Sequence, residues 1–189
     1  MTWILKAGAA SCLTLTLMGC SSPENKYYTL SAAEPATATS PVRTARTISI
    51  DEISVPAYLD RPQIVIKKDS NTADVREYER WIEPLDGMIR RVLAADLSAR
   101  LGDGRVLDKP GKDSALLSIT IEEFGQEGDH AVLRGQWMLK GQQKDAPPAL
   151  AHSFVHEHPV TGKDMPDAVT TMSGLLGILS DEIAGSAGN

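Results

Sequence analysis

Apolar residues gather first in a short N-terminal stretch of this chain, and beyond it they recur with the periods of helices and strands. The N-terminal stretch follows Lys6 and ends before Cys20. About a dozen apolar residues are too few for a membrane span, which needs roughly 20, but they suit the apolar core of a secretory signal. We therefore interpret residues 1–19 as a signal peptide.

Two later segments carry apolar residues at helical spacing, which predicts amphipathic helices at residues 84–101 and 166–184. The first has Pro84 at its first position and Asp86 in its first turn, and Gly102 follows its last apolar residue. These are common start and stop signals of helices. The apolar faces comprise Leu85, Met88, Ile89, Val92, Leu93, Leu97 and Leu101 in the first helix and Val169, Met172, Leu176, Leu179 and Ile183 in the second.

Clear alternation of apolar and polar residues around the turn 125–130 predicts a β-hairpin formed by residues 115–124 and 131–140. Residues 47–55 also predict a strand, with a bulge near Glu52, and the continuously apolar residues 63–67 suit a central strand. Weaker patterns predict the remaining strands, at residues 27–30, 75–81, 105–107 and 150–158.

This order of elements predicts an α/β (α+β) fold, with a single mixed, mostly antiparallel β-sheet and two main helices packed on one face. Two helices cover one face of such a sheet, so the other face must be polar or buried against a partner. The sequence has neither an internal repeat nor a break in composition that would mark a second domain. We therefore expect one domain over residues 27–185.

The apolar N-terminal stretch ends in Leu17-Met18-Gly19-Cys20, which resembles the lipobox of bacterial lipoproteins. The resemblance implies that Cys20 becomes the first mature residue and carries acyl chains, which hold a protein stably on a phospholipid membrane. Residues 20–26 then form a lipidated tether. Ser21 stands where Asp would favour the inner membrane, so the resemblance implies the outer membrane, facing the periplasm. Residues 31–46 are small, polar and rich in proline, and are either a loop or part of the tether.

Composition narrows the function classes. Removal of the signal peptide changes the formal net charge from −6 to −7, with 18 basic against 25 acidic residues. This acidic balance argues against nucleic acid as a partner, because phosphate binding requires clustered Lys and Arg. Cys12 is lost with the signal peptide and Cys20 is acylated, so neither disulfide nor thiol chemistry is expected.

Three landmarks carry a more specific resemblance. They are Tyr28-Thr29-Leu30, residues 53–65 (ISVPAYLDRPQIV) and residues 80–85 (RWIEPL). Together they resemble the PqiC family of ABC-type transport auxiliary lipoproteins over residues 20–101, whereas the C-terminal half matches only in its pattern of elements. The resemblance implies an outer-membrane lipoprotein that works with MCE-domain proteins, which bridge the periplasm as tubes and move phospholipid or other hydrophobic molecules. We also expect a homo-oligomer in the form of a ring, because head-to-tail contacts close into rings and a tube needs a collar.

The landmarks also predict the partner interface, since aromatic residues and Arg are enriched at interface hot spots. The candidate interface residues are Tyr58, Leu59, Asp60, Arg61, Arg80, Trp81 and Glu83. Each has a structural alternative. Asp60 and Arg61 are also suited to bracing a turn, Trp81 to the core, and Arg80 with Glu83 to an intramolecular ion pair.

Other chemistry has little support in the sequence. His152, His156 and His158 share one face of a predicted strand, which leaves zinc binding as a minor alternative. There is no nucleophile elbow, phosphate-cradling loop or His-Glu-x-x-His motif, so we expect no enzyme and no cofactor. The main alternative function is a lipoprotein that itself carries a lipid or other hydrophobic ligand in a pocket between helix and sheet.

Overall fold

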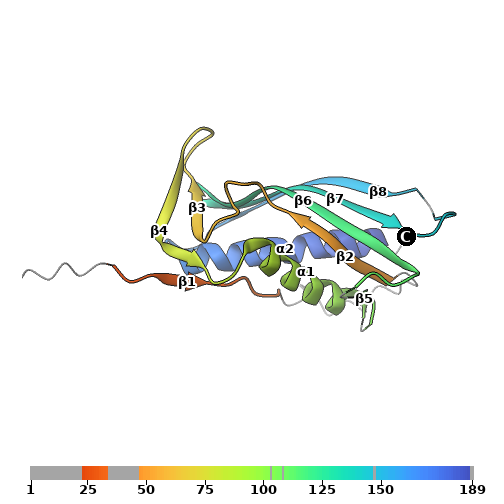
Figure 1. Ribbon diagram of the computed structural model, residues 1–189. Helices are drawn as coiled ribbons and strands as arrows, with labels where there is room; N and C mark the ends of the chain where they lie inside the picture. The colour runs from red at the N-terminus through yellow and green to blue at the C-terminus, as the bar shows by residue number, and fades with distance from the viewer. Residues whose placement is uncertain (1–22, 34–46, 103, 108, 147, 188–189) are drawn as a thin grey trace, which may run out of the picture.

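The computed structural model describes residues 23–33, 47–102, 104–107, 109–146 and 148–187. The predicted signal peptide, Cys20 and residues 34–46 lie outside these ranges. The fold class is confirmed, because a mixed eight-stranded sheet carries two long helices (Figure 1). Its elements, in chain order, are β1 (Lys26–Tyr28), β2 (Thr47–Ser54), β3 (Gln63–Lys67), β4 (Ala73–Trp81), α1 (Leu85–Leu101), β5 (Val106–Leu107), β6 (Ser114–Glu127), β7 (His130–Gly141), β8 (Leu150–Pro159) and α2 (Met165–Ala187).

The longest strand pairings form an antiparallel meander of β6, β7 and β8. The predicted hairpin is confirmed, and β6 pairs with β7 from Ala115 opposite Gly141 to Glu127 opposite His130. Gly128 makes the tight turn between them with a φ of 60°, a conformation that side chains disfavour. β8 then pairs with β7 along its whole length. These antiparallel pairings explain why the sheet is mostly antiparallel, although four shorter pairings are parallel.

The other edge of β6 is shared by two strands. β2 runs parallel to the first half of β6, with the predicted bulge between Ile50 and Glu52. β3 runs parallel to its last residues, Gln126 and Glu127, and lies between β4 and β6 as predicted for a central strand. The segment 55–62 between β2 and β3 therefore leaves the sheet as a loop and returns to the same edge.

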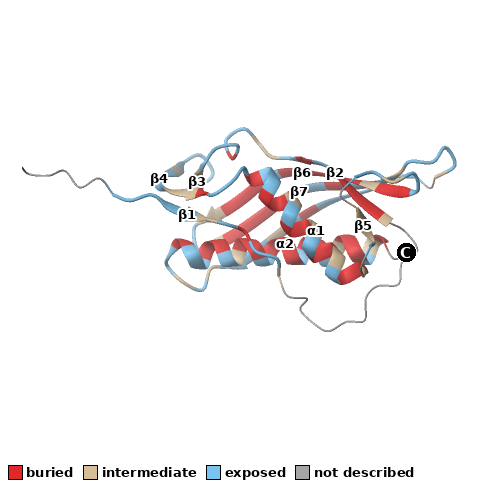
Figure 2. Ribbon diagram, turned by 60° about the horizontal axis from the view of Figure 1, so that its bottom comes forward, coloured by how far each residue is buried: buried red, intermediate tan, exposed pale blue. Residues whose placement is uncertain are grey.

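Both helices lie on one face of the sheet and pack against each other (Figure 1). Figure 2 shows buried residues on α1, α2 and the strands above them, whereas β4 is mostly exposed. The largest fully buried side chains of this layer include Met88, Leu93, Leu97, Leu117, Leu133, Trp137 and Met172. α2 runs three residues beyond the predicted end because Ala184 and Ala187 also pack into the core.

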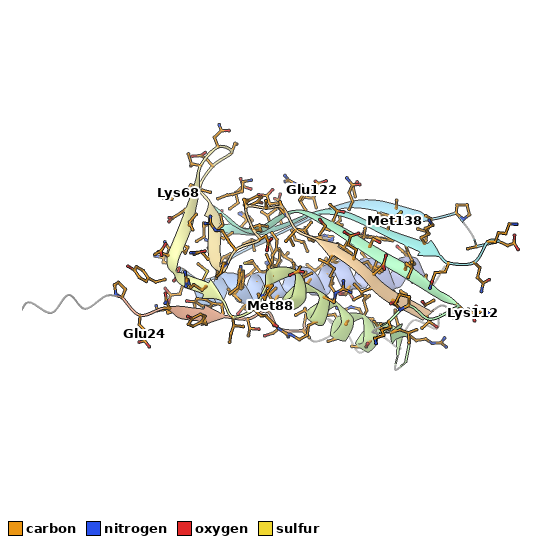
Figure 3. The ribbon with its side chains drawn as sticks, viewed as in Figure 1. Glu24, Lys68, Met88, Lys112, Glu122 and Met138 are labelled. Atoms are coloured by element: carbon orange, nitrogen blue, oxygen red, sulfur yellow. The ribbon has the colours of Figure 1, made fainter. Side chains whose placement is uncertain are left out.

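The second face of the sheet carries polar side chains. Glu122 of β6 and Met138 of β7 lie on the side of the sheet away from the helices (Figure 3). Thr120, Gln136 and other polar residues alternate with buried ones on these strands, and the exposed apolar residues there are Met138 and Val155. This face is therefore mainly polar. The sequence predicted that it would be either polar or buried against a partner.

Candidate functional site

The three sequence landmarks meet at one end of the sheet. β1 runs parallel to the end of β4, with Tyr28 aligned to Trp81. The N–H of Ile82 donates to the carbonyl oxygen of Tyr28 at 3.0 Å, and the N–H of Trp81 donates to that of Pro62 at 2.7 Å. Backbone hydrogen bonds thus join segments that lie far apart in the sequence.

A surface groove of about 310 Å³ lies where the second and third landmarks touch, and we call it the landmark groove. Its lining is Asp60, Arg61, Pro62, Trp81, Ile82, Glu83 and Pro84. The described chain enters the fold at this end, where Figure 3 labels Glu24, and Lys112 lies at the opposite end.

The loop 55–62 is held from within. The N–H groups of Leu59 and Asp60 donate to the carbonyl oxygen of Pro56 at 2.9 and 3.3 Å, which closes a turn. The Leu59 side chain is only 4% exposed and anchors this turn in the core. Within the described residues, the side chains of Asp60 and Arg61 make no hydrogen bond or ion pair. The structural alternative, in which the side chains of Asp60 and Arg61 brace the turn, is therefore not supported.

Tyr58 lies on the other side of the loop, partly exposed. Its hydroxyl is 3.5 Å from the carbonyl oxygen of Glu122 in β6, at the limit of a hydrogen bond. Partial burial, and next the charge of Glu123, raise the pKa of the Tyr58 hydroxyl above its ordinary value. Tyr58 is therefore a neutral aromatic side chain at neutral pH, with its edge available at the surface.

The third landmark divides between core and surface. Trp81 is only 6% exposed and belongs to the core, as its structural alternative predicted. Glu83 is ion-paired, but with Arg91 of α1 at 2.8 Å and not with Arg80. The prediction of an Arg80–Glu83 pair was wrong because α1 turns back over this end and brings Arg91 closer. Arg91 also donates to the Thr29 hydroxyl at 3.1 Å, so this pair links the first and third landmarks.

The seven predicted interface residues differ in exposure. Leu59 and Trp81 are buried and support the groove from beneath, so their side chains are not offered to a partner. Asp60, Arg61 and Glu83 are exposed and line the groove, Arg80 is partly buried, and Tyr58 is exposed on the other side of the loop. Sequence reasoning missed Ile82, which is 64% exposed beside the groove. The signal was available, because alternation along a strand places the neighbour of a buried Trp outward.

Residues 29–33 leave the sheet and cross the helix layer. Leu30 is buried, and the N–H of Ala33 donates to a carboxylate oxygen of Asp96 at 2.9 Å. Burial raises the pKa of Asp96 to about 6, although Arg100 and the Ala33 N–H favour its charged form. Arg100 also donates to the carbonyl oxygen of Gly177 at 3.0 Å, which ties α1 to α2. This buried network was not predicted, since Asp96 and Arg100 look like ordinary helix surface residues.

The histidines of β8 share one face, as predicted, and contact their neighbours. His152 stacks on Trp137 with ring centroids 4.7 Å apart. His156 Nε2 lies 3.2 Å from a carboxylate oxygen of Glu182, and the indole N–H of Trp137 donates to the other at 2.8 Å. Among the described residues, no three metal-ligating side chains converge. The zinc alternative therefore gains no support from this geometry.

Comparison with known proteins identifies the family. The family model described as "ABC-type transport auxiliary lipoprotein component" matches residues 28–184. The chain belongs to this family. It is 30% identical over 142 residues to the intermembrane transport lipoprotein PqiC of Escherichia coli (strain K12), which covers 73% of this chain and 76% of PqiC. The values for PqiC of Shigella flexneri are the same. The resemblance to the PqiC family is thereby confirmed.

Solved structures share the fold. A crystal structure of an uncharacterized protein has a TM-score of 0.73 at 23% identity, covering 87% of this chain and 99% of that chain. A protein from Xanthomonas campestris has a TM-score of 0.67 at 12% identity, with 86% and 95% covered. At these identities the likeness establishes the fold and no function.

Membership in the auxiliary lipoprotein family gives the coarse function. The chain is a membrane-associated lipoprotein of a transport system, and the family is not an enzyme family. Neither α1 nor α2, nor any other helix in the described ranges, is long and apolar enough to cross a membrane.

Proposed function

We propose that this chain is a non-enzymatic, outer-membrane lipoprotein subunit of an MCE/ABC-type trans-envelope lipid transport system. Acylated Cys20 holds the domain at the periplasmic side of the membrane. The landmark groove docks the end of a periplasm-spanning MCE-domain tube protein, and this attachment supports membrane integrity. The observation that carries the proposal is that all three landmarks meet at the end where the chain enters, beside a groove lined by the second and third.

Chain length supports this location of the groove. Only Ser21 and Ser22 separate Cys20 from Pro23, the first described residue. A fully extended chain advances about 3.5 Å per residue, so Tyr28 is no more than roughly 28 Å from the acylated residue. A partner that binds the groove must therefore reach close to the membrane, as a tube that delivers lipid there would.

The rim of the groove has the chemistry of a docking site. Asp60 and Arg61 are exposed charges without partners among the described residues, and complementary charges across an interface fix orientation and exclude wrong partners. Ile82 adds exposed aliphatic surface to the groove, and Tyr58 adds exposed aromatic surface on the other side of the loop. A groove of about 310 Å³ is large enough for one anchoring side chain and its neighbours from a partner.

Assembly into a homo-oligomeric ring is part of the proposal. The sheet has two edges of unlike structure. One edge is β8, and the other is formed by β4 with β1 in one part and by β5 beside β2 in the other. β1 covers only Glu79–Trp81 of β4, which leaves residues 73–78 of that edge without a strand neighbour among the described residues. Unlike edges on one molecule permit the head-to-tail contacts that close into rings. A monodisperse monomer at high concentration in analytical ultracentrifugation would reject the ring.

The alternative of a lipid carrier has no comparable support. It requires a cavity between the helices and the sheet, but Met88, Leu117 and Trp137 fill that layer and are 0 to 1% exposed. The landmark groove and the larger groove along β4 are open surface features. We therefore favour docking over carriage.

The test is a pull-down from membranes with the lipidated chain, followed by identification of captured proteins. The unaltered chain is expected to recover an MCE-domain protein, and Arg61→Glu to recover at least tenfold less. Lys112→Glu makes the same charge change at the opposite end and serves as the matched control (Figure 3). Cys20→Ala checks that capture requires the anchor. Failure of the unaltered chain to recover any MCE-domain protein would reject the docking proposal, and equal capture by Arg61→Glu would reject the groove.

A further inference from the structure

Two of the most exposed apolar side chains lie side by side where the chain enters the sheet. Tyr27 of β1 is 58% exposed, and Ile82, directly after β4, is 64% exposed. Tyr27 is aligned with Arg80, and the Ile82 N–H bonds to the residue after Tyr27. Their neighbours Tyr28 and Trp81 turn inward, so alternation directs Tyr27, Arg80 and Ile82 outward together.

The cation of this surface, Arg80, is unpaired, unlike neighbouring arginines. Arg76 pairs with Glu79 and Arg91 with Glu83. Among the described residues Arg80 has no ion pair, and its Nε is buried without a hydrogen-bond partner. A buried, unsatisfied guanidinium nitrogen is costly unless an acceptor reaches it. A phosphate is a favourable acceptor, because it binds guanidinium groups by paired hydrogen bonds.

We propose that Tyr27, Arg80 and Ile82 form a membrane seat that rests in the headgroup region of the bilayer holding the lipid anchor. Tyrosine is enriched at that depth, and Arg reaches from it to lipid phosphates while its stem stays in apolar surroundings. This inference rests on the proposed acylation of Cys20. Tyr27 lies seven residues after Cys20, so it is within roughly 25 Å of the anchor even in an extended chain.

Charge around the seat indicates which lipids suit it. Glu79 and Glu83 are each paired with an arginine, so Arg80 is the unpaired charge of the seat. One charge attracts a bilayer weakly, and the attraction comes mainly from Tyr27, Ile82 and the phosphate contact of Arg80. Zwitterionic phospholipid is therefore sufficient, and seating depends weakly on salt.

Seating also fixes the orientation of the domain. The end with Glu24 faces the lipid and the end with Lys112 points away from it (Figure 3). The landmark groove, which shares Ile82 with the seat, then opens beside the membrane surface. The seat thereby aligns the groove for a partner that arrives from the periplasm.

The test places an environment-sensitive fluorophore on a single introduced cysteine. The lipidated chain has no other free thiol, so Tyr27→Cys, Ile82→Cys and the control Leu150→Cys are each labelled alone. Leu150 is exposed and apolar but begins β8, at the end away from the seat. In vesicles of phosphatidylcholine and phosphatidylethanolamine, positions 27 and 82 are expected to gain emission by about twofold or more, and bilayer-embedded quenchers to reverse the gain. Position 150 is expected to show neither effect.

Two failures are distinguishable. The first failure is that the chain does not float with vesicles, which would mean that the acylation of Cys20 is wrong. The seat is then tested with a Cys20→Ser chain that an N-terminal polyhistidine tag holds on nickel-chelating lipid. The fluorophores at positions 27, 82 and 150 are measured on this chain in the same way. If the chain floats by either route but positions 27 and 82 behave like position 150, the seat is rejected and a protein partner is favoured for this surface.

Two matched variants test the proposed contact between Arg80 and a lipid phosphate. Arg80→Gln is expected to reduce the emission gain at position 27 about twofold, whereas Arg76→Gln, which removes a paired arginine of the same strand, leaves it unchanged. Equal behaviour of the two variants would overturn the role of Arg80.

Discussion

The two ends of this sheet use the same alternation of side chains for different purposes. Along β6, β7 and β8, the inward residues pack on two helices and the outward residues are mostly polar, as the fold requires. At the end formed by β1, β4 and the loop 55–62, buried Leu59 and Trp81 support the outward Asp60 and Arg61, which make no ion pair among the described residues. Exposed charges without a partner at this end are the reason for the docking proposal.

The largest expected effect comes from breaking the well-packed end. Trp137→Ala is expected to lower the free energy of unfolding by about 3–5 kcal/mol, because it leaves a cavity and removes the hydrogen bond to Glu182. Urea denaturation of the soluble domain measures the change. Partner capture per folded molecule is expected to stay constant, and its selective loss would mean that the two ends are not separable.

Leu59→Ala probes the support of the loop beside the landmark groove. The side chain is buried, so its truncation is expected to cost about 2–4 kcal/mol of unfolding free energy. Unlike Trp137→Ala, it is also expected to reduce capture of the MCE-domain protein per folded molecule, because the turn that presents Asp60 and Arg61 loses its anchor. Urea denaturation and the membrane pull-down, run on the same preparations, check both. Unchanged capture would show that the loop keeps its shape without Leu59.

Asp96→Asn is expected to change how the unfolding free energy of the helix layer depends on pH. The folded-state pKa of Asp96 is raised to about 6, so its contribution to stability is fully present below pH 4 and is lost as pH rises through 6. Asn cannot ionise and keeps the acceptor for Ala33. The variant is therefore expected to match the unaltered chain at pH 4 and to exceed its unfolding free energy by about 1–2 kcal/mol at pH 7.5, after allowance for solvent screening. Thermal unfolding across pH 4–8 measures the difference, and a constant difference would contradict the raised pKa.

Glu83→Gln is expected to have the smallest effect on stability. Its ion pair with Arg91 is half exposed, so its loss costs less than about 1 kcal/mol. If Glu83→Gln reduces capture of the partner while the unfolding free energy changes by less than about 1 kcal/mol, Glu83 belongs to the interface. A loss of stability above 2 kcal/mol would instead assign it to holding the first and third landmarks together.

Most of the fold was predictable because it depends on local periodicity. The helix over 84–101, the hairpin of β6 and β7 and the bulge near Glu52 follow from spacing alone. The parallel pairings of β2 and β3 with one edge of β6 were not predictable, since no local signal encodes which distant strand a segment joins. For the candidate site, the resemblance selected segments that meet in the structure, but burial of Leu59 and Trp81, the Glu83–Arg91 pair and the exposure of Ile82 depend on that long-range arrangement.

The shared edge of β6 has a consequence for the order of folding. β6, β7 and β8 follow one another along the chain, so their pairing closes only short loops and is expected to form early. β2 and β3 must find β6 across about sixty residues, and β1 must find β4 across about fifty, which is slower. The β3–β4 pair brings the two sides of the groove together locally, so we expect the groove to form early and to join the scaffold of β6, β7 and β8 late.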